Sequence, residues 1–277
     1  MKLISKKIKV KDHTFHYLES GNEDIADKDR TILCIHGLPG SSTDYRKIAE
    51  HLKSTCRIVA VDLLGNGKSD KPMDEDYAIE TQADYIVRLA AILNLRNVIV
   101  IGHSYGGAVS QAVVASDPNR FIGLVLLASI GFVPHILYKK LIMPMRVFAL
   151  LLMVPKSYKF IKPLALHGFK RIGFPEQFAN DKRLLLIVSK SAARIDFRTI
   201  AENAERIACP TVYISCTHDP YVQPAVRIAL SEKIKKFQYV ELEGNSHMVQ
   251  FTHAGQVAEA VTEFLPRTVV TFPGHEA

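Results

Sequence analysis

Short runs of β-branched and aliphatic residues alternate with stretches of helical periodicity along most of this chain, and this alternation constrains the fold most. The predicted strands are TILCI (31–35), RIVAV (57–61), NVIVIG (97–102), FIGLVLLA (121–128), TVYIS (211–215) and FQYVEL (237–242). NVIVIG shows no polar alternation, as expected of a parallel strand covered on both faces. Strand–helix alternation predicts an α/β fold with a mostly parallel central sheet and helices on both faces.

Helices are predicted near 44–52, over 78–95 and 104–116, and near 224–234 and 254–265. In the second of these, Ile79, Ala83, Ile86, Ala90 and Leu93 fall on one stripe, as in an amphipathic helix. The first 18 residues suggest an antiparallel opening hairpin. The tail from residue 267 has no periodicity and is expected to be loose.

The alternation stops between residues 132 and 208, where helices and loops rich in Leu, Lys and Pro are expected. We predict that residues 1–131 and 209–277 form the core and that 132–208 form an inserted helical cap. Residues 132–198 hold 13 Lys and Arg but only 3 Asp and Glu, so the net charge of +7 comes from this segment. The apolar run VFALLLMV (147–154) within it is too short to span a bilayer.

The composition of the chain bears on its core, its compartment and its partners. A chain of 277 residues that is 48% hydrophobic can bury an ample core. The start carries charge and no apolar run of the kind found in signal peptides, so a cytoplasmic protein is expected. The four cysteines show no metal-ligand spacing and are expected to be buried free thiols. Neither a metal nor a nucleic-acid partner is expected.

Ser104 lies in GHSYGG (102–107), directly after a predicted strand and at the start of a predicted helix. A serine at such a tight turn has strained backbone angles, and its neighbours must be small, as Gly102 and Gly106 are. Its hydroxyl then stands at the carboxyl edge of the sheet, beside a helix amino terminus that favours developing negative charge. This setting favours a nucleophile over a serine that merely caps a helix.

A serine nucleophile needs a base, and the base needs an acid that orients it. Asp219 follows the strand TVYIS, and His247 follows the strand FQYVEL, so both are expected at the same sheet edge as Ser104. Asp62 ends an earlier strand and is interpreted as a structural loop cap. His218, beside the acid, is interpreted as a surface or loop residue.

Acyl transfer also needs donors for the oxyanion. We predict that the backbone N–H groups of Tyr105 and Leu38 supply them. Leu38 lies in the loop HGLPGS (36–41), where His36 and Gly37 are expected to support the site.

These elements together resemble the α/β-hydrolase fold superfamily over residues 14–266. The matching motifs are HGLPGS, DLLGNGKSDKP (62–72), GHSYGG, HDPYV (218–222) and NSH (245–247). The resemblance implies Ser104 as nucleophile, His247 as base, Asp219 as orienting acid, and no cofactor. Within the superfamily, the chain is most similar to the capped serine esterase and monoacylglycerol-lipase-like group.

Other members of the superfamily fit less well. Epoxide hydrolases and haloalkane dehalogenases carry an aspartate where this chain has Ser104. Proline iminopeptidases favour HGGPG and a tryptophan after the serine, whereas this chain has Leu38, Tyr105 and no tryptophan. Hydrolases of carbon–carbon bonds carry a longer glycine loop.

The expected function is a serine hydrolase that cleaves carboxylic esters of apolar acyl groups through an acyl-enzyme. A carbon–carbon or amide hydrolase, a slowly hydrolysing small-molecule receptor, and an acyltransferase remain open alternatives. The expected partner is a small acyl ester. A weak contact between the basic cap and an anionic lipid surface is also open, as is the simpler interpretation that the lysines are a solvated helix face.

Overall fold

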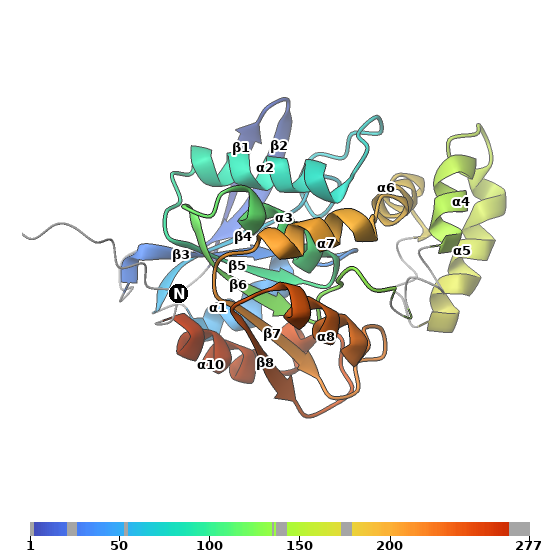
Figure 1. The fold of residues 1–277 in the computed structure, drawn as a ribbon. Helices are drawn as coiled ribbons and strands as arrows, with labels where there is room; N and C mark the ends of the chain where they lie inside the picture. The colour runs from blue at the N-terminus through green and yellow to red at the C-terminus, as the bar shows by residue number, and fades with distance from the viewer. Residues whose placement is uncertain are drawn as a thin grey trace, which may run out of the picture.

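The computed structural model describes residues 3–20, 27–52, 55–134, 136, 143–172 and 179–265 (Figure 1). Within them the chain forms an eight-stranded sheet of order β1-β2-β4-β3-β5-β6-β7-β8. The strands are β1 (Ile4–Val10), β2 (His13–Glu19), β3 (Asp27–Ile35), β4 (Cys56–Val61), β5 (Val98–His103), β6 (Phe121–Leu127), β7 (Thr211–Cys216) and β8 (Phe237–Leu242). The predicted fold class is confirmed, and each strand predicted from its sequence run is present.

Strand direction divides the sheet into two parts. β1 and β2 form an antiparallel hairpin, and β2 also pairs antiparallel with β4. All other neighbours pair in parallel. The carboxyl ends of β3 to β8 therefore lie at one edge, where loops that follow different strands can meet. β5 and β6 are buried along their whole length, which explains their continuous apolar sequence.

Helices cover both faces of the sheet. On one face, α2 (Ile79–Ile92), α3 (Tyr105–Ser116) and α8 (Pro224–Lys233) share a core that includes Ile86, Val109 and Leu230. On the other face, the one-turn helix η1 (Ser42–Tyr45), α1 (Arg46–Leu52), α9 (Val249–Thr252) and α10 (Ala254–Phe264) enclose a second core. α3 is buried on all sides, and its sequence is correspondingly rich in small and apolar residues, with Ser110 and Gln111 as buried polar exceptions.

Among the described residues, four helices lie between β6 and β7. They are α4 (Met143–Leu151), α5 (Tyr158–Ile172), α6 (Lys182–Ala193) and α7 (Phe197–Arg206). Asp181 and Asp196 begin α6 and α7 by accepting hydrogen bonds from backbone N–H groups of the first turn. α4 contacts α5 and α6, whereas α7 packs against α3. The proposed cap of residues 132–208 remains a prediction, and part of it (135, 137–142 and 173–178) lies outside the described residues.

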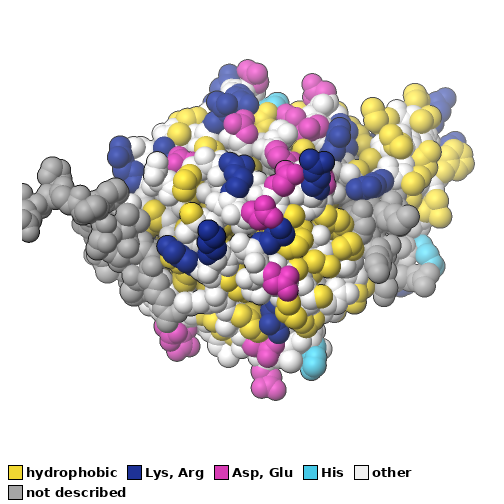
Figure 2. Space-filling model, in the orientation of Figure 1, with side chains coloured by type: hydrophobic (Ala, Val, Ile, Leu, Met, Phe, Trp, Pro, Cys, Tyr) yellow, Lys and Arg dark blue, Asp and Glu magenta, His cyan; other side chains and the backbone are white. Residues whose placement is uncertain are grey.

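The surface formed by α4 and α5 is rich in apolar side chains (Figure 2). None of the helices in the described ranges is both long and apolar enough to cross a membrane. All four cysteines are free, and three of them, Cys34, Cys56 and Cys216, are buried. The predicted loose tail from residue 267 lies outside the described residues.

Candidate active site

Ser104 occupies the turn between β5 and α3 with a strained backbone. Its φ of 52° and ψ of −117° lie in a region that L-residues rarely adopt. The turn is held on both sides, because the Ser104 N–H donates to the Leu127 carbonyl at 3.0 Å and its carbonyl accepts from the Gly107 N–H at 3.0 Å. Strain of this kind costs about 1–3 kcal/mol and persists where the surrounding structure enforces it. The predicted strand-to-helix turn is thus present at this serine.

The glycines on either side of Ser104 allow a close approach of neighbouring groups. A Cβ at Gly106 would lie 2.2 Å from the His36 carbonyl oxygen, and one at Gly102 would lie 2.2 Å from the Ser110 Oγ. Neither distance is compatible with a side chain. The requirement for small residues, predicted from the tight turn, follows here from packing against the loop after β3 and against α3 itself.

His247 links Ser104 to Asp219 through two hydrogen bonds. The Ser104 hydroxyl donates to His247 Nε2 over 3.0 Å, and His247 Nδ1–H donates to Asp219 Oδ2 over 2.8 Å. The three residues come from loops after β5, β7 and β8, which meet because these strands are parallel neighbours. All three side chains are buried. The structure therefore brings together the three residues that the sequence assigned to one relay.

The second oxygen of Asp219 is held by its own loop. Oδ1 accepts the backbone N–H of Tyr221 at 2.8 Å and that of Val222 at 2.9 Å. These bonds leave Oδ2 directed at His247. His218, beside Asp219, is exposed to solvent, as its interpretation as a loop residue required.

Two aromatic rings enclose His247. His103 lies 4.9 Å away between ring centroids, and its Nε2–H donates to the His247 carbonyl at 3.0 Å. The Tyr221 ring stands edge-on to His247 at 5.2 Å. Complete burial, with the nearby His247, lowers the pKa of His103 to about 3, so His103 is neutral near pH 7. Neither His103 nor Tyr221 was assigned a catalytic role from the sequence.

The loop that carries Leu38 packs directly against the Ser104 turn. Gly37 lies so close to His103 that a Cβ there would come within 2.7 Å of His103 Nδ1. His36 is fully buried; its Nδ1–H donates to the Gly37 carbonyl at 2.7 Å, and its Nε2 accepts the Leu63 N–H at 3.0 Å. Tyr105 is the first residue of α3, where backbone N–H groups lack partners within the helix. The assignment of Leu38 and Tyr105 as oxyanion donors stays a prediction.

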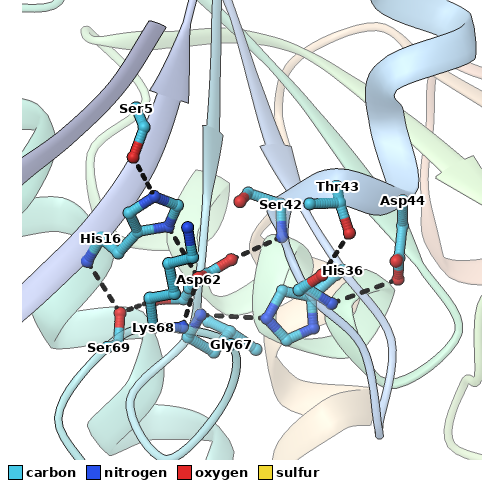
Figure 3. Close-up of polar contacts among 12 residues, drawn as sticks. Ser5, His16, His36, Ser42, Thr43, Asp44, Asp62, Gly67, Lys68 and Ser69 are labelled. Carbon is cyan, nitrogen blue, oxygen red and sulfur yellow. Dashed lines mark hydrogen bonds and ion pairs between the residues drawn. The ribbon is translucent and has the colours of Figure 1, made fainter. Parts of the chain in front are cut away.

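A second Ser–His–Asp cluster is formed by Ser5 of β1, His16 in the middle of β2, and Asp62 directly after β4 (Figure 3). The Ser5 hydroxyl donates to His16 Nε2 at 2.8 Å, and His16 Nδ1–H donates to Asp62 Oδ2 at 2.7 Å. Asp62 also accepts the backbone N–H groups of Ser42 at 2.6 Å and Lys68 at 2.7 Å. Burial alone would raise the pKa of Asp62, but these donors hold it below its usual value.

Asp62 therefore ties together β2, the loop that carries Leu38 and the loop DLLGNGKSDKP. Its interpretation as a loop cap agrees with these contacts. Sequence reasoning did not identify His16 or Ser5, because neither lies in a recognisable motif. The only available signal was the position of Asp62 at the end of a strand.

Two cavities outlined by described residues do not include Ser104 in their lining. One of about 820 Å³ lies between α4 and the α6–α7 connection. A smaller one, about 340 Å³, lies behind the Asp219 loop and includes Asp219 in its lining. Over the described ranges, no three His, Cys, Asp or Glu side chains are grouped so that they could hold a metal ion.

Comparisons with known proteins agree with this architecture. A sequence profile of the alpha/beta hydrolase fold matches residues 30–154. A putative lipase from Acinetobacter baumannii superposes with a TM-score of 0.75 at 24% identity, covering 96% of this chain and 92% of that structure. The chain therefore has the alpha/beta hydrolase fold, and the predicted resemblance is confirmed at the level of the fold superfamily.

Curated relatives match over a shorter stretch. The uncharacterised hydrolase YugF of Bacillus subtilis is 29% identical over 117 residues, which is 42% of this chain and 40% of the relative. A haloalkane dehalogenase of Mesorhizobium japonicum is 32% identical over 121 residues, which is 44% of this chain and 37% of the relative. The chain thus spans less than half the length of these relatives. The capped esterase subgroup remains a prediction.

Proposed function

We propose that this protein is a serine hydrolase that cleaves carboxylic esters of apolar acyl groups through an acyl-enzyme. The observation that carries the proposal is the hydrogen-bonded relay from Ser104 through His247 to Asp219, at 3.0 and 2.8 Å, built on a strained strand-to-helix turn. A serine hydroxyl needs this arrangement of base and orienting acid to act as a nucleophile near neutral pH.

In the first half of the reaction, His247 Nε2 takes the Ser104 proton while Oγ attacks the acyl carbon. The carbonyl oxygen becomes an oxyanion, which the N–H groups of Leu38 and Tyr105 would stabilise. The ester C–O bond then breaks, and the departing alkoxide takes the proton from His247. Asp219 keeps the imidazole in the required tautomer and stabilises its charged form.

In the second half, His247 Nε2 takes a proton from a water molecule, whose oxygen attacks the acyl-enzyme. Collapse of this second intermediate breaks the bond to Ser104 Oγ and returns the proton to Ser104. The products are the carboxylic acid and a restored hydroxyl.

The identity of the nucleophile supports ester chemistry over two other reactions of this fold. Epoxide hydrolases and haloalkane dehalogenases use an aspartate at the turn, and this chain has Ser104 there, although one relative is a haloalkane dehalogenase. The name of the similar A. baumannii structure, a putative lipase, fits an acyl ester substrate. The preference for apolar acyl groups rests on the apolar runs FALLLMV (148–154) and PLAL (163–166) in the proposed cap.

A fluorophosphonate probe and a panel of nitrophenyl esters, lactones and aminoacyl amides test the proposal. The wild-type protein should form a covalent adduct on Ser104, detected by peptide mass spectrometry, and should turn over esters of medium acyl chains faster than acetates. Ser104→Ala should lose both properties while its circular dichroism is unchanged.

Ser5→Ala is the matched control, because Ser5 also donates to a histidine held by an aspartate. It should keep both labelling and turnover. Retained ester turnover by Ser104→Ala would reject the assignment. Turnover of amides or carbon–carbon substrates in place of esters, or a single slow turnover, would replace it with one of the other hydrolase or receptor functions.

A further inference from the structure

Exposed apolar side chains are concentrated in one part of the molecule. Of the eleven large hydrophobic side chains that are exposed among the described residues, seven lie between positions 147 and 164. The most exposed are Leu150 (71%), Phe160 (68%), Met153 (67%) and Leu164 (62%). We call the outward side chains of residues 147–164 the docking face. Apolar patches of this kind on a protein surface mark interaction sites.

The core does not require these apolar residues. α5 buries Ile161, Ala165 and Phe169, which are spaced four residues apart on its inner face. Phe160 and Leu164 each precede one of the buried residues and point away from the core, where a solvated helix would carry polar side chains. α4 contacts α5, so their outer surfaces adjoin (Figures 1 and 2).

Positive charge accompanies the docking face. Residues 143–172 contain six Lys and Arg and no Asp or Glu. Arg146, Lys156 and Lys159 are exposed, and Lys159 Nζ lies 4.9 Å from the centre of the Phe160 ring. Apolar side chains bordered by cations are typical of segments that lie in a membrane interface and bind anionic lipids. The same charges repel a second copy of this face, so the charge favours a lipid surface.

A cavity adjoins the docking face and has the same mixed chemistry. The cavity of about 820 Å³ is lined by Leu150 and Met153 of the docking face, together with Arg146 and Arg194. Glu80 and Asp196 contribute negative charge to the same lining. An apolar cavity of this volume with two guanidinium groups could hold part of an amphiphile that leaves the lipid surface.

We propose that the docking face of α4 and α5 binds the surface of an anionic lipid bilayer, with its apolar side chains in the interfacial region and its lysines against the headgroups. The inference rests on the proposed function only in that docking would deliver lipid-borne esters to Ser104. Lipid binding itself requires no turnover, so the two proposals can fail separately.

Flotation with lipid vesicles tests the docking. The Ser104→Ala protein, which should hydrolyse no lipid, is mixed with vesicles of phosphatidylcholine alone or with added phosphatidylglycerol. It should float with the phosphatidylglycerol vesicles at low salt and less at high salt. The double variant Leu150→Asp/Phe160→Asp should bind at least tenfold more weakly. Replacing Lys156, Lys159 and Lys162 by Gln should reduce the affinity by about fivefold per lysine that reaches the headgroups.

Ile92→Asp and Ile228→Asp are matched controls, because these isoleucines are 55% and 50% exposed on helices of the core. Both should bind vesicles like the parent protein. The docking proposal is wrong if the parent does not bind at low salt, if the double variant still binds, or if the controls lose binding equally. A dimer in analytical ultracentrifugation that Leu150→Asp dissociates would show that a second copy covers the face.

Turnover of a water-soluble nitrophenyl ester separates the two proposals. With Ser104 restored, Phe160→Asp should keep this activity, because Phe160 lies outside the two apolar runs assigned to the acyl group and outside the lining of the 820 Å³ cavity. Circular dichroism should show that the double variant folds. Vesicle binding without ester turnover in the wild-type protein would leave the docking proposal standing and reject the proposed function.

Discussion

Two serine–histidine–aspartate clusters in this protein have almost the same side-chain geometry. In the first, Ser104, His247 and Asp219 are joined at 3.0 and 2.8 Å; in the second, Ser5, His16 and Asp62 are joined at 2.8 and 2.7 Å. A cavity of about 670 Å³ borders the second cluster, and one of about 340 Å³ borders Asp219 of the first, so an adjoining cavity does not distinguish them.

The backbone around each serine separates the two clusters. Ser104 has a positive φ, and the helix α3 begins at the next residue, so Ser104 lies at a helix amino terminus. Ser5 lies in the edge strand β1, where it pairs opposite Leu18 in a regular antiparallel register. Asp62 also accepts hydrogen bonds from two further loops, through the backbone N–H groups of Ser42 and Lys68. The comparison shows that hydrogen bonds among serine, histidine and aspartate do not mark a candidate catalytic site by themselves. The backbone conformation at the serine separates the two clusters.

Replacing His247 and His16 in turn should give the largest difference in ester turnover between the two clusters. His247→Gln removes the base, and kcat/KM for esters should fall by about 10⁶, as when a serine nucleophile loses its partner. His16→Gln should leave kcat/KM unchanged but lower the free energy of unfolding by about 1–3 kcal/mol, because buried hydrogen bonds are lost. Ester kinetics and urea denaturation measure the two effects. A large loss of turnover in His16→Gln, with the protein folded, would contradict the division of roles.

Replacing the two aspartates should likewise affect turnover in one cluster and stability in the other. The effect on turnover should be smaller than that of His247→Gln. Asp219→Asn leaves the geometry intact but favours the wrong tautomer of His247, so kcat should fall by about 10⁴. Asp62→Asn weakens the hydrogen bonds that Ser42, Lys68 and His16 donate to this side chain. The free energy of unfolding should fall by about 3–5 kcal/mol. Steady-state kinetics on folded protein and thermal melts distinguish these outcomes. Equal stability losses in both variants would show that Asp219 is also a structural tie.

The smallest expected effect is the loss of folding stability at acid pH, which we assign to His103 beside the Ser104 cluster. His103 has a folded-state pKa of about 3, whereas an exposed histidine titrates near about 6.5. Between these values the unfolded chain binds the extra proton, so this contribution to stability is complete above about pH 6.5 and is lost as the pH falls. The slope should approach about 1.4 kcal/mol per pH unit.

His103→Gln tests this assignment, because glutamine can still donate to the His247 carbonyl but does not titrate. Urea denaturation between pH 7 and pH 4 should show a shallower loss of stability in this variant than in the wild type. His16→Gln measured over the same range provides the comparison from the other cluster. An unchanged slope in His103→Gln would assign the acid sensitivity to other groups.

Much of the architecture and the relay could be predicted from local sequence patterns. β5 and β6 are apolar without interruption because they are buried on both faces, and the turn at Ser104 required Gly102 and Gly106. The chain order of Ser104, Asp219 and His247, each after a predicted strand, was enough to place all three at one sheet edge. Periodicity and turn chemistry are properties of neighbouring residues, so a sequence reveals them directly.

Contacts between distant segments that no motif or strand end marks could not be predicted in this way. His103 and His247 are 144 positions apart, and Ser5, His16 and Asp62 meet only because β2 pairs with both β1 and β4. The outward direction of Phe160 and Leu164 likewise depends on which side of α5 faces the core, and an apolar run does not specify that side.

The sequence by itself determined the strands, the helices and the order of the reactive residues, because these follow from local periodicity and turn chemistry. Only the tertiary structure decided that His16 became a structural tie between Ser5 and Asp62, and which apolar side chains remained in solvent. Those outcomes depend on the register of the sheet and on packing between segments far apart in the chain.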